Sequence, residues 1–80
     1  MERTPEEQSE LNSLGDNIRK IRLENHLTQA ELAAELDIEK PNLSRIENGK
    51  TNPTFLTLKK IARKLYVHVC AFIPGTKNEK

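Results

Sequence analysis

The chain has 80 residues, which is enough for one small domain and leaves little room for a second. Hydrophobic residues make up 35% of it, and with two Phe, one Tyr and no Trp the core has to come mostly from Leu, Ile and Ala. This composition favours a small helical bundle and argues against a multi-step enzyme.

Charge is distributed unevenly along the chain, although the net charge is only +1. Residues 1–10 carry four acidic residues against one basic residue, which gives −3, whereas residues 11–80 carry twelve basic against eight acidic, which gives +4. The basic excess of the body is too small to establish nucleic-acid binding by itself. The spacing of individual residues has to decide the function.

The chain is expected to stay in the cytoplasm. Its longest apolar run, Val69 to Ile73, has five residues, far short of the roughly 20 that span a bilayer. The acidic start lacks the apolar segment of a secretory signal. Cys70 is the one cysteine and cannot form an internal disulfide, which agrees with a reducing compartment. A chain this small without a disulfide often needs a partner subunit.

The first predicted helix starts at Thr4, where Thr4 and Glu7 form a capping box around Pro5. It runs to about Asn25, and Gly15 is expected to fray or divide it. Its apolar face repeats every three or four residues and consists of Leu11, Leu14, Ile18 and Ile21.

Two short helices are predicted next. Thr28 and Glu31 form a second capping box, and Asp37 suits the turn after that helix. The following helix begins near Lys40 and Pro41 and ends at Asn48, where Gly49 supplies a left-handed stop. The expected inward residues are Leu32, Ala33 and Leu36 in one helix and Leu43 and Ile46 in the other.

A fourth helix is capped by Thr54, and the segment after it is ambiguous. Residues 67–73 read either as a short helix after His68 or as a β-prone stretch. The predicted buried stripe of the fourth helix is Phe55, Leu58, Ile61, Ala62 and Leu65.

The turn Asp37–Glu39 between two short helices is typical of the motif that lays one helix across a DNA duplex and the next in its major groove. The segments LTQAELA (27–33) and LSRIENGK (43–50), followed by Pro53, resemble the lambda-repressor-like (Xre-type) helix-turn-helix family. With further matches in the first and fourth helices, the resemblance covers roughly residues 14–66. It implies an all-α domain of four to five helices over residues 13–73, preceded by an acidic extension, 1–12, that leads into the first helix and followed by a frayed tail, 74–80.

The resemblance also implies roles for individual residues. Residues 40–48 become the recognition helix, and Arg22 and Glu47 become a partly buried pair that joins the first and third helices. Asp37 and Glu39 depart from the family, which usually has Gly and a small polar cap at these positions. The residues expected to contact DNA are Thr28, Gln29, Lys40, Pro41, Asn42, Ser44, Arg45, Asn48 and Lys50.

Together these features predict a sequence-specific transcriptional regulator, of repressor or controller type, that binds double-stranded DNA as a homodimer on a two-fold operator. No cofactor, metal or catalytic residue is expected, because His68 and Cys70 lack further ligands nearby and Ser44 lacks an oxyanion hole. A rival interpretation is a protein-interaction module such as an antitoxin, with a toxin or RNA polymerase as partner, which the acidic residues 1–10 favour. The expected dimer interface is Val67, Val69, Phe72 and Ile73.

Overall fold

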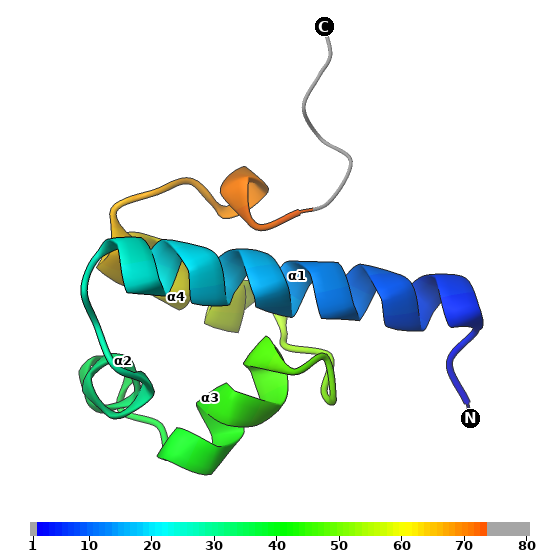
Figure 1. Ribbon diagram of the computed structural model, residues 1–80, viewed down its shortest axis with the longest axis horizontal. Coiled ribbons are helices and arrows are strands. Elements are labelled where there is room, and N and C mark those ends of the chain that lie inside the picture. The colour runs from blue at the N-terminus through cyan, green and yellow to red at the C-terminus, as the bar shows by residue number, and fades with distance from the viewer. Residues whose placement is uncertain (1, 74–80) are drawn as a thin grey trace, which may run out of the picture.

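The computed structural model describes residues 2–73, within which four α-helices are followed by one turn of 3-10 helix and no strand occurs. Helix α1 runs along one side of the molecule, with α2 and α3 beneath it and α4 behind it (Figure 1). The predicted all-α class is therefore confirmed, whereas the predicted tail, 74–80, lies outside the described residues. The elements are α1 (Pro5–Glu24), α2 (Gln29–Leu36), α3 (Lys40–Glu47), α4 (Phe55–Leu65) and η1 (Val69–Ala71).

Three of the four α-helices begin at a threonine, as predicted. The hydroxyl of Thr4 accepts a hydrogen bond from the backbone N–H of Glu7 at 3.0 Å, and the same capping box forms between Thr28 and Glu31. Thr54 caps α4 in the same way. Helix α3 is the exception, because the side chain of Glu39 at its cap position makes no such bond.

All four helices end in the same way. Each is followed by a residue with a left-handed backbone, and the N–H of the next residue donates to a carbonyl five positions earlier, at 2.9–3.2 Å. After three of the helices that next residue is apolar and packs on the core, whereas after α3 it is the exposed Lys50. The left-handed residues are His26, Asp37, Gly49 and Tyr66; Asp37 and Gly49 were predicted from the sequence.

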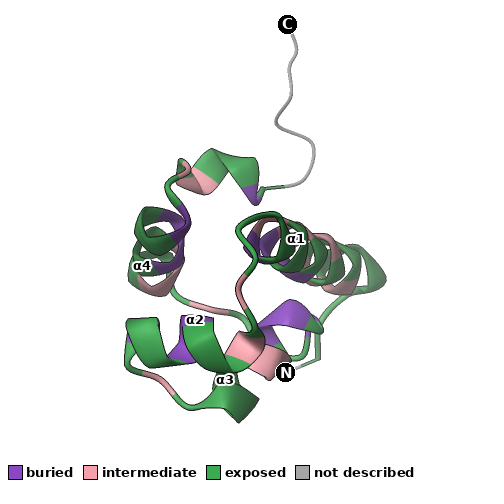
Figure 2. Ribbon diagram, turned by 60° about the vertical axis from the view of Figure 1, so that its left-hand side comes forward, coloured by how far each residue is buried: buried purple, intermediate pink, exposed green. Residues whose placement is uncertain are grey.

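The core lies between the pair α1 and α4 and the pair α2 and α3, where the inward faces of the helices meet (Figure 2). The predicted stripe of α4 is correct for Ile61, Ala62 and Leu65 but wrong for Phe55, which is 62% exposed. Phe55 is the first residue of α4, and its ring lies outside the core with the Lys59 ammonium 5.9 Å from the ring centre.

The ambiguous segment after α4 forms η1 and inserts Phe72 into the core, where its side chain is fully buried. The side-chain amide of Asn17 in α1 donates to the carbonyl of Phe72 at 2.9 Å. The expectation that Phe72 contacts a second copy is therefore wrong for the folded chain, because this ring completes the core of its own domain. Val67 and Val69 are half-buried against the same core, and Ile73 is 40% exposed.

Gly15 neither frays nor divides α1, which is continuous from Pro5 to Glu24. It is buried against the end of α3, where a Cβ atom at this position would lie 2.5 Å from the carbonyl oxygen of Ile46. The backbone cannot yield to such an atom without moving a helix. Glycine is therefore required here for the close approach of α1 and α3.

Gly15→Ala is expected to destabilise the domain by about 2–3 kcal/mol, because the added methyl group forces the two helices apart. Urea unfolding measures this change. Ser9→Ala, at an exposed position of the same helix, serves as the control and should change stability by less than about 0.5 kcal/mol. Equal stability of the two variants would show that α1 and α3 adjust without cost.

Candidate nucleic-acid interface

Helices α2 and α3 form a unit on one side of the molecule, below α1 and α4 in Figure 2. Asp37, in the left-handed conformation, reverses the chain between them, and Ile38 packs from the turn onto the core. Buried Ala33 lies on the inner face of α2, which packs on both α3 and α4. This is the predicted helix-turn-helix arrangement, and it leaves the outer face of α3 open to solvent.

A buried ion pair sets the position of α3 relative to α1. The Nε of Arg22 donates to Oε2 of Glu47 at 2.7 Å, and a second guanidinium nitrogen donates to Oε1 at 3.1 Å. The two residues are 6% and 3% exposed, so the pair lies deeper than the sequence predicts. Such two-point contact between planar groups restricts both distance and orientation.

Two further hydrogen bonds connect this pair to α2 and to the loop that precedes it. The third guanidinium nitrogen of Arg22 donates to the carbonyl of Leu27 at 2.7 Å, and the side-chain amide of Gln29 donates to Glu47 at 2.9 Å. Gln29 is therefore a structural link between the start of α2 and the end of α3, a role that the sequence analysis missed. Nothing in the local sequence of α2 indicates this partner, which lies 18 residues away.

Four of the residues predicted to contact DNA are exposed on α3. Arg45 is in its last turn, and the other three, Lys40, Pro41 and Asn42, are in its first turn. The guanidinium of Arg45 donates to Oδ1 of Asn42 at 2.7 Å, which holds it along the helix surface. Asn48 instead donates its amide to the carbonyl of Ser44 at 2.9 Å, and Ser44 is half-buried. The predicted contact residues of α3 and its C-cap thus form two hydrogen-bonded pairs, Arg45 with Asn42 and Asn48 with Ser44.

A hollow of about 320 Å³ lies beside this face, between α3 and the loop that follows it. Asn42 and Arg45 of α3 line this hollow on one side, and residues of the loop and of the start of α4 line it on the other. The remaining lining residues are Ile38, Ile46, Thr51, Asn52, Pro53, Thr54 and Thr57.

Two elements next to α3 offer donors to a phosphate. At the start of α2, the Thr28 hydroxyl accepts from the N–H of Glu31, and the Glu31 carboxylate accepts from the N–H of Thr28, so a negative charge lies beside this helix end. The N–H groups of Gln29 and Ala30 have no intrahelical acceptors. These groups and the helix dipole suit a phosphate. On the other side, the exposed Lys50 extends from the loop after α3.

The surface lacks a broad positive field. The exposed acidic residues of α2 and the turn outnumber the three exposed basic residues of α3 and its loop. Long-range attraction to phosphate is therefore weak, and close contacts have to supply affinity. The exposed acidic residues of α2 and the turn are Glu31, Glu35, Asp37 and Glu39.

Within residues 2–73, no cluster of three or more His, Cys, Asp or Glu is placed to hold a metal ion, and no helix is long and apolar enough to cross a membrane.

The sequence is similar to known helix-turn-helix proteins. The family description "Helix-turn-helix" (HTH_3) matches residues 18–71. Control protein C.MunI of Mycoplasma sp is 38% identical over 66 residues, which cover 81% of this chain and 89% of that protein. The immunity repressor protein of Bacillus phage phi105 is 34% identical over 61 residues, which cover 76% of this chain and 42% of the repressor. This chain thus matches less than half of that longer relative.

A solved structure extends the likeness to three dimensions. The restriction-modification controller protein C.AhdI from Aeromonas hydrophila superposes with a TM-score of 0.78 over 81% of this chain and 98% of that chain. Its sequence identity is 22%, so this likeness shows the fold alone.

Glu47→Ala is expected to cost about 3–5 kcal/mol of stability, because it leaves the Arg22 guanidinium buried without a counter-charge. Thermal or urea unfolding measures the loss. The control is Asp16→Ala, which removes the exposed pair of Asp16 with Arg19, 2.8 Å apart, and should cost no more than about 1 kcal/mol. Similar losses in the two variants would contradict a special role for the buried pair.

Proposed function

The chain belongs to the helix-turn-helix family, and on that premise we propose that it is a DNA-binding transcriptional regulator of repressor or controller type. Helix α3 enters the major groove, and α2 lies across the phosphate backbone. The observation that carries the proposal is the exposed outer face of α3, with Arg45 held by Asn42, between the open start of α2 and Lys50.

Arg45 is proposed to read the base sequence. Its planar guanidinium can donate two hydrogen bonds to N7 and O6 of guanine, and the contact with Asn42 reduces the rotamer freedom lost on binding. Lys40 and Asn42 are exposed in the first turn of α3, at opposite edges of the outer face. Pro41 lies among them and offers no N–H donor.

Phosphate contacts flank this base contact. The start of α2, with Thr28 and Gln29, binds one phosphate through backbone N–H groups, and Lys50 binds another beyond the end of α3. Asn48 and Ser44 are proposed as further contacts at this end of α3, where the Asn48 amide nitrogen donates to Ser44.

We propose that the regulator acts in the cytoplasm as a homodimer on a two-fold operator, without a cofactor and without catalysing a reaction. We propose the carboxyl-terminal segment as the interface, because Ile73 is exposed there and Val67 and Val69 are only half-buried. A two-fold protein matches a palindromic site, because each copy presents its α3 to one half-site.

A protein-binding role is the alternative that a specific observation favours, namely the excess of exposed acidic residues on α2 and the turn. In that case the main partner is another protein, such as a toxin or RNA polymerase. Selection of bound sequences from random duplex DNA separates the two roles, because a DNA-binding homodimer enriches a palindromic motif and a protein-binding module enriches none.

Arg45→Ala is expected to cost about 1–3 kcal/mol on the selected operator and to relax preference at one position in each half-site. Lys50→Ala should weaken operator and unrelated duplexes alike and reduce the salt slope of binding by about one. Titrations of both duplexes at several salt concentrations measure these effects. Lys64→Ala, which removes an exposed cation in the last turn of α4, is the charge-matched control and should change neither. An equal loss on all duplexes for Arg45→Ala would make Arg45 a phosphate contact.

Ile73→Asp is expected to shift the chain from dimer to monomer, because a buried carboxylate opposes an apolar interface. Sedimentation velocity over a range of concentrations measures the shift. The control is Leu56→Asp, an equal change at a 72% exposed apolar residue outside the proposed interface, which should leave the dimer intact. A wild-type chain that remains monomeric at high concentration contradicts the proposed dimer.

A further inference from the structure

The first half of α1 lies outside the region that matches the family description, which starts at residue 18. Within the described residues, its opening turns contact the loop after α3, although the two segments are some forty residues apart in the chain. Gln8 makes the longest-range of these contacts, and its position continues the inward stripe of Leu11 and Ile18. A polar residue in that register of an apolar stripe indicates a polar partner.

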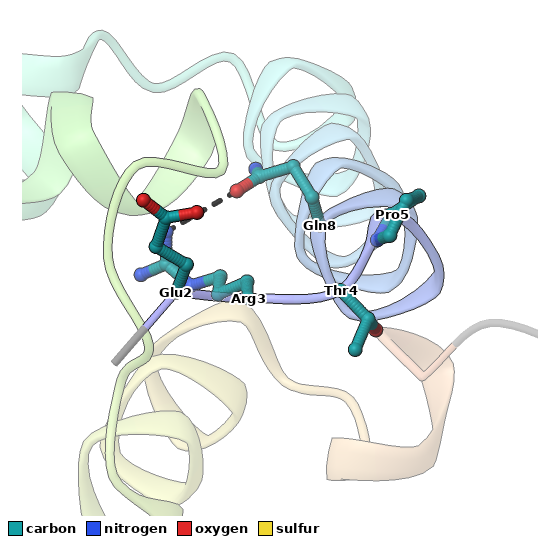
Figure 3. A pocket seen from close by; sticks show the side chains of 5 residues that line it. All are labelled: Glu2, Arg3, Thr4, Pro5 and Gln8. Atoms are coloured by element: carbon teal, nitrogen blue, oxygen red, sulfur yellow. Dashed lines mark hydrogen bonds between the residues drawn. The ribbon is translucent and has the colours of Figure 1, made fainter.

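The side-chain amide of Gln8 is held on both of its ends. Its Nε2 donates to the carbonyl oxygen of Gly49 at 2.6 Å and to Oδ1 of Asn12 at 3.0 Å. Its Oε1 accepts a hydrogen bond from the guanidinium of Arg3 at 3.2 Å, which Figure 3 shows as a dashed line. These contacts orient the amide so that its donor group faces the loop.

Gly49 is buried under α1 and has a left-handed backbone, with φ of +72°. A Cβ atom here would lie 3.0 Å from Cα of Asn12, so the loop backbone contacts the helix directly. Two residues one turn apart on α1, Gln8 and Asn12, therefore fix this glycine, one by a hydrogen bond and one by close packing.

The peptide group between Gly49 and Lys50 is held from both sides. Its carbonyl oxygen accepts from Gln8 of α1, and its N–H donates to the carbonyl of Arg45 in α3 at 2.9 Å. Because the peptide group is planar, hydrogen bonds at its oxygen and its nitrogen together restrict its rotation and so the direction in which the chain continues at Lys50. The Lys50 side chain thus starts from a defined point beside the recognition face.

We propose that Gln8 is a positioning residue for DNA binding, one that holds the Gly49–Lys50 peptide so that Lys50 is presented to a phosphate. The inference rests on the proposed function. Gln8 does not itself contact DNA in this proposal; it lowers the ordering cost of the loop before binding. The acidic extension of α1 thereby contributes to DNA affinity through the loop, in spite of its unfavourable charge.

The test is Gln8→Met, which keeps the length and helix propensity of the side chain and removes the donor. Affinity for operator and unrelated duplexes should fall about fivefold, the effect of one lost hydrogen bond, with an unchanged salt slope. In a Lys50→Ala background the same substitution should cause no further loss, because the group that Gln8 positions is gone. Ser9→Ala, at the adjacent exposed position, is the control and should bind as the wild type does.

Amide hydrogen exchange in the DNA-free protein provides a second measurement. The Lys50 N–H should exchange several-fold faster in Gln8→Met than in the wild type, whereas that of Ile38, in the equivalent bond after α2, should not change. Equal losses of affinity in the wild-type and Lys50→Ala backgrounds, or unchanged exchange at Lys50, would overturn the proposal. A wild-type chain that binds no duplex contradicts the proposed function instead, and exchange at Lys50 then still decides whether Gln8 holds the loop.

Discussion

The arrangement of the whole domain depends on one buried ion pair, between Arg22 of α1 and Glu47 of α3. Neither charge can leave water at acceptable cost without the other, so the helices that carry them have to meet at one distance and orientation. Gln29 adds α2 to the same network through Glu47. A pair of this kind contributes little net stability compared with an apolar contact of equal size, and its two-point geometry restricts the orientation of α3 on α1. The face that α3 presents to solvent follows from that restriction.

The four helix ends use the same local turn in two different settings. After α1, α2 and α4 the left-handed residue turns an apolar side chain onto the core, and the core in return stabilises the turn. After α3 the same turn carries Lys50 and lacks this apolar contact. Its place is taken by the first turns of α1, which cover Gly49 and hold its carbonyl through Gln8. The loop that carries the exposed Lys50 is thus held by α1 in addition to its own turn.

Much of the fold and part of the site follow from short stretches of sequence. The capping boxes at Thr4 and Thr28, the turn at Asp37 and the stop at Gly49 were all predictable, because each depends on residues within one helical turn of one another. The four helices and their inward faces follow from periodicity in the same way. The Arg22–Glu47 pair was expected only from the family resemblance, and its depth of burial was not.

Sequence by itself therefore determined where the helices begin and end and which faces turn inward, since hydrogen bonds and periodicity over a few residues decide these features. Only the tertiary structure decided what those faces meet: it places Gly15 against the carbonyl of Ile46, buries Phe72 in its own core and brings Gln8 to Gly49. The last two places could not be predicted from local patterns, and Gly15 was misread, because a glycine or an apolar residue has the same local signature whether it frays a helix, fills a core or faces a partner. Packing between segments distant in the chain decides which of these three places a residue takes, because the core has to be filled and its polar groups paired.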